Sequence, residues 1–113
     1  MVRAIRSGIG GVIVFAIGRM ASEGRLPRNP FVGIRIPSTM RSDAAWFAGH
    51  SAAAPALKAA GLGPIGTAII VAATRPNRDV ETSLYRLGVA WLVGGLAVAT
   101  FQAHRAAQAE NTV

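Results

Sequence analysis

The chain has no cysteine among its 113 residues, which excludes disulfides, a thiolate nucleophile and any cysteine-ligated metal. Acidic residues are scarce as well, with 5 Asp and Glu against 12 Lys and Arg. The sequence offers no Ser/His/Asp order, no paired carboxylates, no phosphate-binding glycine loop and no cluster of metal ligands. We therefore expect a protein without enzymatic activity and without a metal or other cofactor.

Aromatic residues make up only 6% of the chain, although 51% of it is hydrophobic. The apolar residues gather in three runs, at residues 7–18, 51–74 and 87–103. A membrane-spanning helix needs about 20 residues, and arginine side chains that reach toward the interfaces can extend the shorter runs. We predict an all-α integral membrane protein with a single membrane domain over residues 1–113. Its transmembrane helices are expected at residues 4–22, 43–74 and 82–104, with a polar loop of residues 23–42 that contains proline and glycine between the first two.

The net charge of +7 would suggest nucleic acid as a partner if the protein were soluble. Here the basic residues flank the apolar runs, as expected near anionic lipid headgroups. We therefore expect membrane lipids as partners and no nucleic acid. A small excess of basic residues on the side of the first loop favours a cytoplasmic position for it. The Ala, Gly and Arg content suggests a GC-rich bacterial genome, and hence a multi-pass protein of the bacterial cytoplasmic membrane.

The three runs leave alternatives open. The basic start, the short first run and the stretch Ala16-Ile17-Gly18 also fit a cleaved secretory signal, although the two further runs favour a spanning helix. Pro64 lacks an N–H and crowds the preceding turn, which predicts a kink or break near residues 61–64.

In the third run, small residues stand four apart and let helices approach closely. They suit contacts within the chain or, alternatively, a dimer interface; the pairs are Ala90 with Gly94 and Gly95 with Ala99.

The polar loop holds most of the residues that can recognise a partner. Asn29 followed by Pro30 favours the start of a turn, and Gly33 permits a positive φ or a close backbone approach. Ser42 is the predicted N-cap of the following helix. That helix places Trp46 and His50 on one face, with Trp46 expected at the depth of the lipid headgroups.

Arg35 and His50 each have a functional and a structural interpretation. The guanidinium of Arg35 suits a carboxylate or a phosphate, including that of a lipid headgroup. Alternatively, it pairs with Asp43 or a helix C-terminal carbonyl and only fixes the loop. His50 can titrate near neutral pH or bind a metal, but it has no second ligand nearby, so a hydrogen bond to the loop backbone is its expected role.

These residues resemble the signature of the SdpI family of small bacterial membrane proteins. In that family an Asn-Pro-x-x-Gly-x-Arg-Thr-Pro-Trp-Thr loop leads into a helix that bears Trp and, four residues on, His. Ile36 and Ser38 stand where the family usually has Thr and Trp. The matching residues, which are our candidate binding residues, are Asn29, Pro30, Gly33, Arg35, Pro37, Thr39, Trp46 and His50.

The resemblance implies an integral membrane protein with a functional loop. The name-giving member of the family is longer than this chain. It gives immunity against a secreted toxic peptide, and it signals by holding a transcriptional repressor at the membrane. By analogy, we expect the loop to bind a toxin peptide or a cytosolic regulator. The alternative is a small accessory subunit of a larger membrane complex, a role suited to helices with small-residue faces.

Overall fold

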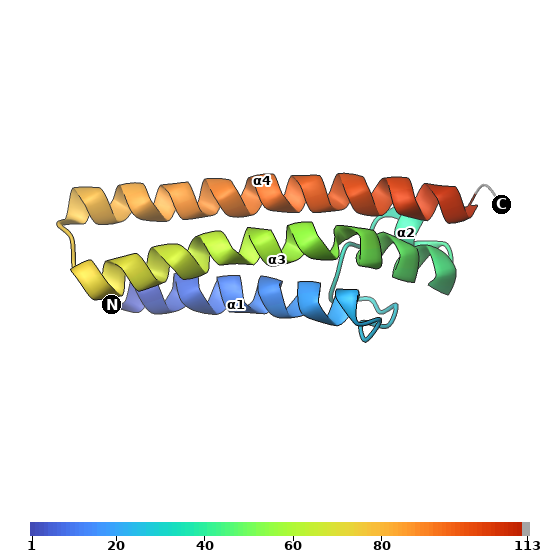
Figure 1. Cartoon of the computed structure of the whole chain (residues 1–113), viewed down its shortest axis with the longest axis horizontal. Coiled ribbons are helices and arrows are strands. Elements are labelled where there is room, and N and C mark those ends of the chain that lie inside the picture. The colour runs from blue at the N-terminus through green and yellow to red at the C-terminus, as the bar shows by residue number, and fades with distance from the viewer. Residues whose placement is uncertain (112–113) are drawn as a thin grey trace.

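Three long helices lie side by side in the computed structural model, which describes residues 1–111 and measures 55 × 20 × 20 Å (Figure 1). The helices are α1 (Val2–Ser22), the short α2 (Pro37–Met40), α3 (Asp43–Thr74) and α4 (Arg78–Asn111). No strand occurs within residues 1–111. Because α1, α3 and α4 are each long and apolar enough to cross a membrane, the predicted fold class of an all-α protein with three spanning helices is confirmed.

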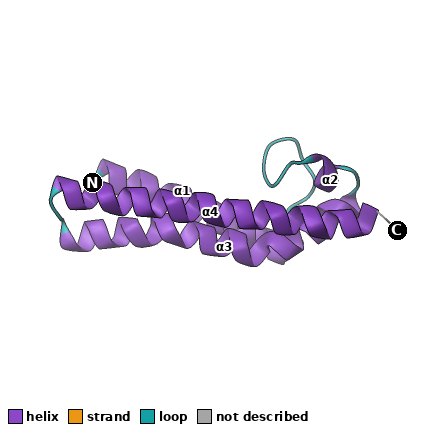
Figure 2. Cartoon of the chain, turned by 90° about the horizontal axis from the view of Figure 1, so that it is seen from above, coloured by secondary structure: helices purple, strands orange, loops and turns teal. Residues whose placement is uncertain are grey.

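The central helix is α3, which packs against α1 on one side and α4 on the other. Both α3 and α4 continue past the end of α1, and the loop and α2 lie against this extension (Figure 1). Seen from above, the loop stands out to one side of the bundle (Figure 2). The loop and the C-terminal end of α4 are therefore at the same end of the molecule.

The ends of the helices follow from local sequence. Gly24 has a positive φ of 66°, the conformation that commonly terminates a helix, just after α1. Arg75 takes the same left-handed region after α3, and Pro76 then prevents the helix from continuing. The side chain of Ser42 accepts a hydrogen bond from the N–H of Ala45 at 3.0 Å, so the predicted N-cap of α3 is confirmed. Asn77 caps α4 in the same way, by accepting from the N–H of Val80 at 3.0 Å.

Of the predicted kink or break near residues 61–64, the break does not occur, because α3 runs without interruption from Asp43 to Thr74 and contains both Pro55 and Pro64. Neighbouring helices supply polar contacts around the second proline. The indole of Trp91 donates to the carbonyl of Ala59 at 2.7 Å, and the hydroxyl of Ser7 donates to the carbonyl of Pro64 at 2.9 Å. These hydrogen bonds join the backbone of α3 to α4 and to α1 close to the proline.

The third long helix was predicted at residues 82–104, but α4 begins at Arg78 and extends to Asn111. Its start follows from the Asn77 cap. Its end follows from burial and hydrogen bonding, since Ala103 and Ala107 are fully buried and the side chain of Asn111 donates to the carbonyl of Ser38 at 3.0 Å. The polar C-terminal end of α4 is thus held against α2.

Glycine makes the close approach of the helices possible. A Cβ added at Gly11 of α1 would lie 2.5 Å from the carbonyl oxygen of Gly61 in α3. On the other side of α3, a Cβ at Gly95 would lie 2.5 Å from the Cβ of Ala60. Gly11 and its neighbours in α1 therefore pack against α3. Cleavage of a secretory signal after Gly18 would remove these residues.

The two small-residue pairs of α4 have different surroundings. Gly95 contacts Ala60 and Ala99 is fully buried, so this pair makes contacts within the chain. Ala90 and Gly94 are exposed, and a Cβ added at Gly94 would meet nothing within 4 Å.

Candidate functional site

Asn29 organises the first turn of the loop. Its side-chain oxygen accepts from the N–H groups of Phe31 at 2.8 Å and Val32 at 2.7 Å. Its amide nitrogen donates to the carbonyls of Pro27 at 2.8 Å and Val32 at 3.1 Å. An asparagine that bonds nearby backbone groups in this way replaces the hydrogen bonds of a regular turn, so Asn29 fixes the shape of the loop tip.

Thr39 fixes the second part of the loop. It is fully buried, and its hydroxyl donates to the carbonyl of Ile34 at 2.7 Å and accepts from the N–H of Ile36 at 3.2 Å. Pro37 stands at the first position of α2, where the missing N–H costs nothing. Together, Pro37 and Thr39 determine where α2 begins.

The loop is fastened to α3 by Trp46 and His50. The indole of Trp46 is fully buried and donates to the carbonyl of Leu26 at 2.8 Å. The ring of His50 stacks on that of Trp46 with centroids 4.0 Å apart. The predicted common face is confirmed, and none of the Trp46 side chain is exposed, so the indole packs inside the protein and does not face its surroundings.

The hydrogen bonds of His50 define its protonation. Its Nε2 accepts from the backbone N–H of Ile34 at 2.9 Å, and its Nδ1 lies 2.8 Å from the carbonyl of Trp46. Since a carbonyl can only accept, Nδ1 carries the proton and donates, and the ring is neutral. The structural role that we expected for His50 is confirmed. Within residues 1–111, no group of three or more His, Asp or Glu side chains could hold a metal.

Gly33 allows the loop to lie directly on the two rings. Its φ of +114° belongs to a region that side-chain-bearing residues rarely adopt. A Cβ at this position would lie 2.8 Å from Nε2 of His50 and 2.9 Å from the ring of Trp46. The glycine is therefore needed both for the backbone angle and for the contact.

The loop is also joined to the end of α4. The hydroxyl of Ser38 lies 2.8 Å from Nδ1 of His104, and its carbonyl accepts from Asn111. Sequence reasoning missed this contact, because the family signature has a different residue at position 38 and His104 is distant in sequence. The contact ties α2 to the third spanning helix.

The remaining candidate residues face outward. Arg35, Pro30 and Pro37 are all exposed, and Arg35 makes no hydrogen bond or ion pair with any of residues 1–111. The expected alternative, a pair with Asp43, does not form, since Asp43 binds Arg28 at 3.2 Å. Sequence reasoning also missed Phe31, which is 85% exposed. We call Pro30, Phe31, Arg35 and Pro37 the outer face of the loop.

Charge on the loop is only partly neutralised. Glu23 binds Arg19 at 3.0 Å and Arg25 at 3.2 Å, and these hydrogen bonds hold the pKa of its carboxyl below the usual value. Asp43 forms an ion pair with Arg28. Since both acids next to the loop are paired with other arginines, Arg35 remains available for an anionic group from outside the chain.

Replacing His50 with phenylalanine should loosen the loop while keeping the stack on Trp46. The N–H of Ile34 would lose its acceptor, and a buried donor without a partner costs about 1–3 kcal/mol. Hydrogen–deuterium exchange of the segment 25–42 should become faster, while exchange in α1 stays the same. Unchanged exchange of the loop would show that His50 does not hold it.

The model of the SdpI/YfhL protein family matches residues 25–104, which include the whole loop from Arg25, α2, α3 and most of α4. No curated protein and no solved structure matches the chain. The family match covers well over half of the 113 residues, and it contains every residue of the signature described above. The chain therefore belongs to the SdpI/YfhL protein family.

Proposed function

We propose that this protein is a receptor-like component of the bacterial cytoplasmic membrane, which acts in immunity against a toxic peptide or in signalling to a cytosolic regulator. Binding takes place on the outer face of the loop. The observation that supports this proposal most strongly is the unpaired, exposed Arg35 on a loop whose backbone is fixed by the side chains of Asn29, Thr39 and His50.

A rigid loop is a good binding surface because little conformational entropy is lost when the partner binds. Family signature residues that face inward hold the loop, whereas those that face outward remain free for contacts. In this proposal Asn29, Gly33, Thr39, Trp46 and His50 act as positioning residues. Direct contacts come from Arg35 and the neighbouring exposed residues.

The chemistry of the outer face indicates the kind of partner. Arg35 offers a planar set of donors that suits a carboxylate, and Phe31 presents an almost completely exposed ring. Aromatic and arginine side chains are the residues most often found at the centre of binding interfaces. We therefore propose a peptide segment that carries a carboxylate and an apolar side chain.

Changing Arg35 to alanine should weaken binding strongly without affecting the fold. Loss of a charge-assisted hydrogen bond costs about 1.5–3 kcal/mol, which corresponds to roughly 10- to 100-fold weaker binding. A strain that lacks the gene would be complemented with wild type, Arg35→Ala or Arg78→Ala and exposed to culture medium of the producing bacterium. Arg78 is the exposed first residue of α4, and the start of α4 lies at the end of the bundle away from α2 (Figure 1), so Arg78 serves as the control.

Protection by wild type and Arg78→Ala, but not by Arg35→Ala, is expected at equal abundance in the membrane. Full protection by Arg35→Ala would contradict the assignment of the site. If wild type itself gives no protection, immunity is excluded and signalling through the same face remains to be tested by recovery of a regulator.

A second function, as an accessory subunit of a larger complex, is favoured by one observation. Ala90 and Gly94 form an exposed small-residue face on α4, and a Cβ added at Gly94 would meet no atom of residues 1–111 within 4 Å. Such faces promote close helix–helix contact in membranes. Replacing Gly94 with leucine should release a stoichiometric membrane partner in mild detergent if this function is correct, and should change nothing in a protein that is purified alone.

A further inference from the structure

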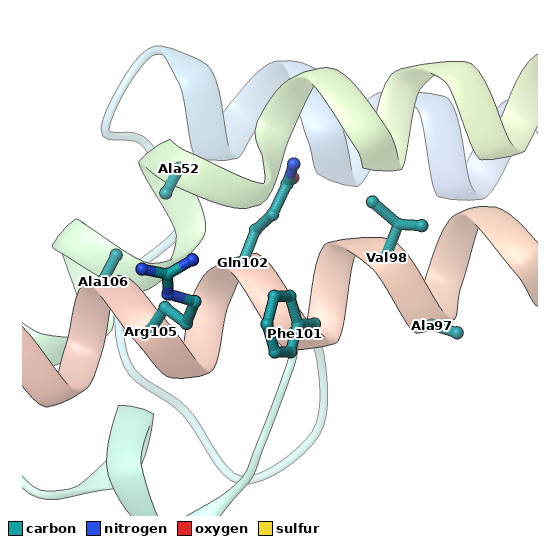
Figure 3. A pocket seen from close by; sticks show the side chains of 7 residues that line it. All are labelled: Ala52, Ala97, Val98, Phe101, Gln102, Arg105 and Ala106. Carbon is teal, nitrogen blue, oxygen red and sulfur yellow. The ribbon is translucent and has the colours of Figure 1, made fainter.

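A groove of about 800 Å³ lies between α3 and α4, near the end of the bundle that carries the loop (Figure 3). Its lining is mainly apolar and includes Ala52 of α3 and Ala97, Val98 and Phe101 of α4. Two polar side chains, Gln102 and Arg105, belong to the same lining and reach from α4 toward α3. The groove therefore combines an apolar part with a polar, cationic end.

The sequence of α4 shows how deep this groove lies in the membrane. Arg86 and Arg105 enclose an interval without any Asp, Glu, Lys or Arg. With a rise of about 1.5 Å per residue, the two arginines are separated by about 28 Å along the helix, close to the ~30 Å thickness of the hydrocarbon layer. Arg105 therefore lies at the depth of the headgroups, and Val98 and Phe101 lie beside the acyl chains.

Arg105 and Gln102 have unused hydrogen-bonding capacity. Neither side chain makes a hydrogen bond or an ion pair within residues 1–111, and both residues are exposed. The guanidinium of Arg105 is 5.8 Å from the centre of the Phe101 ring, a contact that uses the face of the ring and leaves the N–H groups free. These donors can bind an anion that enters at headgroup depth.

We propose that the groove binds one anionic phospholipid. Its phosphate accepts hydrogen bonds from Arg105 and Gln102, and one acyl chain lies along Val98, Phe101 and Ala52. Guanidinium groups bind phosphate through two parallel hydrogen bonds, and the apolar part continues into the hydrocarbon layer. The charge at one end and the apolar surface at the other thus match a phospholipid in both chemistry and depth. This site is independent of the outer face of the loop.

Native mass spectrometry of the full chain in mild detergent would test the site. Phosphatidylglycerol and phosphatidylcholine of equal chain length would be added separately to wild type, Arg105→Gln and Arg86→Gln. Arg86 is the matched control, since it flanks the same span of α4 at its other end and is exposed. Wild type and Arg86→Gln are expected to retain one phosphatidylglycerol, whereas Arg105→Gln should retain roughly 10-fold less.

Two further measurements separate the proposal from simpler explanations. Ala52→Leu fills the apolar part and should also reduce retention, while inorganic phosphate at millimolar concentration should not displace the lipid. Equal retention of the two lipids by wild type, or an equal loss in Arg86→Gln and Arg105→Gln, would overturn the proposal. Displacement by inorganic phosphate would overturn it as well, because it would show that the acyl chain does not contribute.

Discussion

Replacing Trp46 with alanine is expected to destabilise the protein by about 3–5 kcal/mol, as for other fully buried tryptophans. The indole fills the space between α3 and the loop, and it donates to the carbonyl of Leu26 at 2.8 Å. His50 would lose its stacking partner at the same time. Thermal unfolding in detergent should shift strongly to lower temperature, and less protein should accumulate in the membrane.

Two variants serve as comparisons for this prediction. Trp46→Phe keeps a ring on His50 but removes the indole N–H, so it should cost about 1–3 kcal/mol. Phe31→Ala changes a ring that is 85% exposed and should change stability by less than about 0.5 kcal/mol. A Trp46→Ala variant as stable as Phe31→Ala would show that the tryptophan is not part of the core of the fold.

Gly11→Ala is expected to have the second large effect, because it adds a methyl group where α1 and α3 are closest. The new Cβ would lie 2.5 Å from the carbonyl oxygen of Gly61 and 2.8 Å from the side chain of Ile65. The carbonyl belongs to helix backbone, so the two helices must move apart. Overpacking of this kind costs about 1–3 kcal/mol, to be measured as a lower unfolding temperature.

The neighbouring residue gives a matched control for the same chemical change. A Cβ at Gly10 would meet nothing within 4 Å, and glycine inside a helix is less favourable than alanine by about 0.5–1 kcal/mol. Gly10→Ala should therefore leave stability unchanged or raise it. If both variants lower stability equally, the close contact between α1 and α3 is not what holds the bundle together.

The three spans, their order and the Ser42 cap could be predicted from the sequence, because apolar runs and capping residues act locally. The length of α4 could not, since it depends on tertiary contacts of Ser38 with His104 and Asn111. The unbroken path of α3 through Pro64 could not be predicted either, because local sequence rules favour a break at an internal proline and the side chains that contact α3 near it come from residues distant in sequence.

In the candidate site, too, some features could be predicted from local sequence and others depend on tertiary contacts. The spacing of Trp46 and His50 predicted a shared helix face, which the stacked rings confirm. Sequence spacing could not show that Trp46 turns inward to Leu26 while Phe31 points outward, because this depends on the path of the loop backbone. A motif of eight residues therefore divides into side chains that build the loop and side chains that the loop displays.

We propose that the outer face of this rigid loop binds a partner. This binding is tested most directly by affinity purification from the native membrane in mild detergent, with wild type and an Arg35→Ala/Phe31→Ala variant compared by mass spectrometry. We predict that a peptide or protein is recovered with wild type and lost from the double variant, although both unfold at the same temperature. Recovery of the same partner with both proteins would contradict the claim.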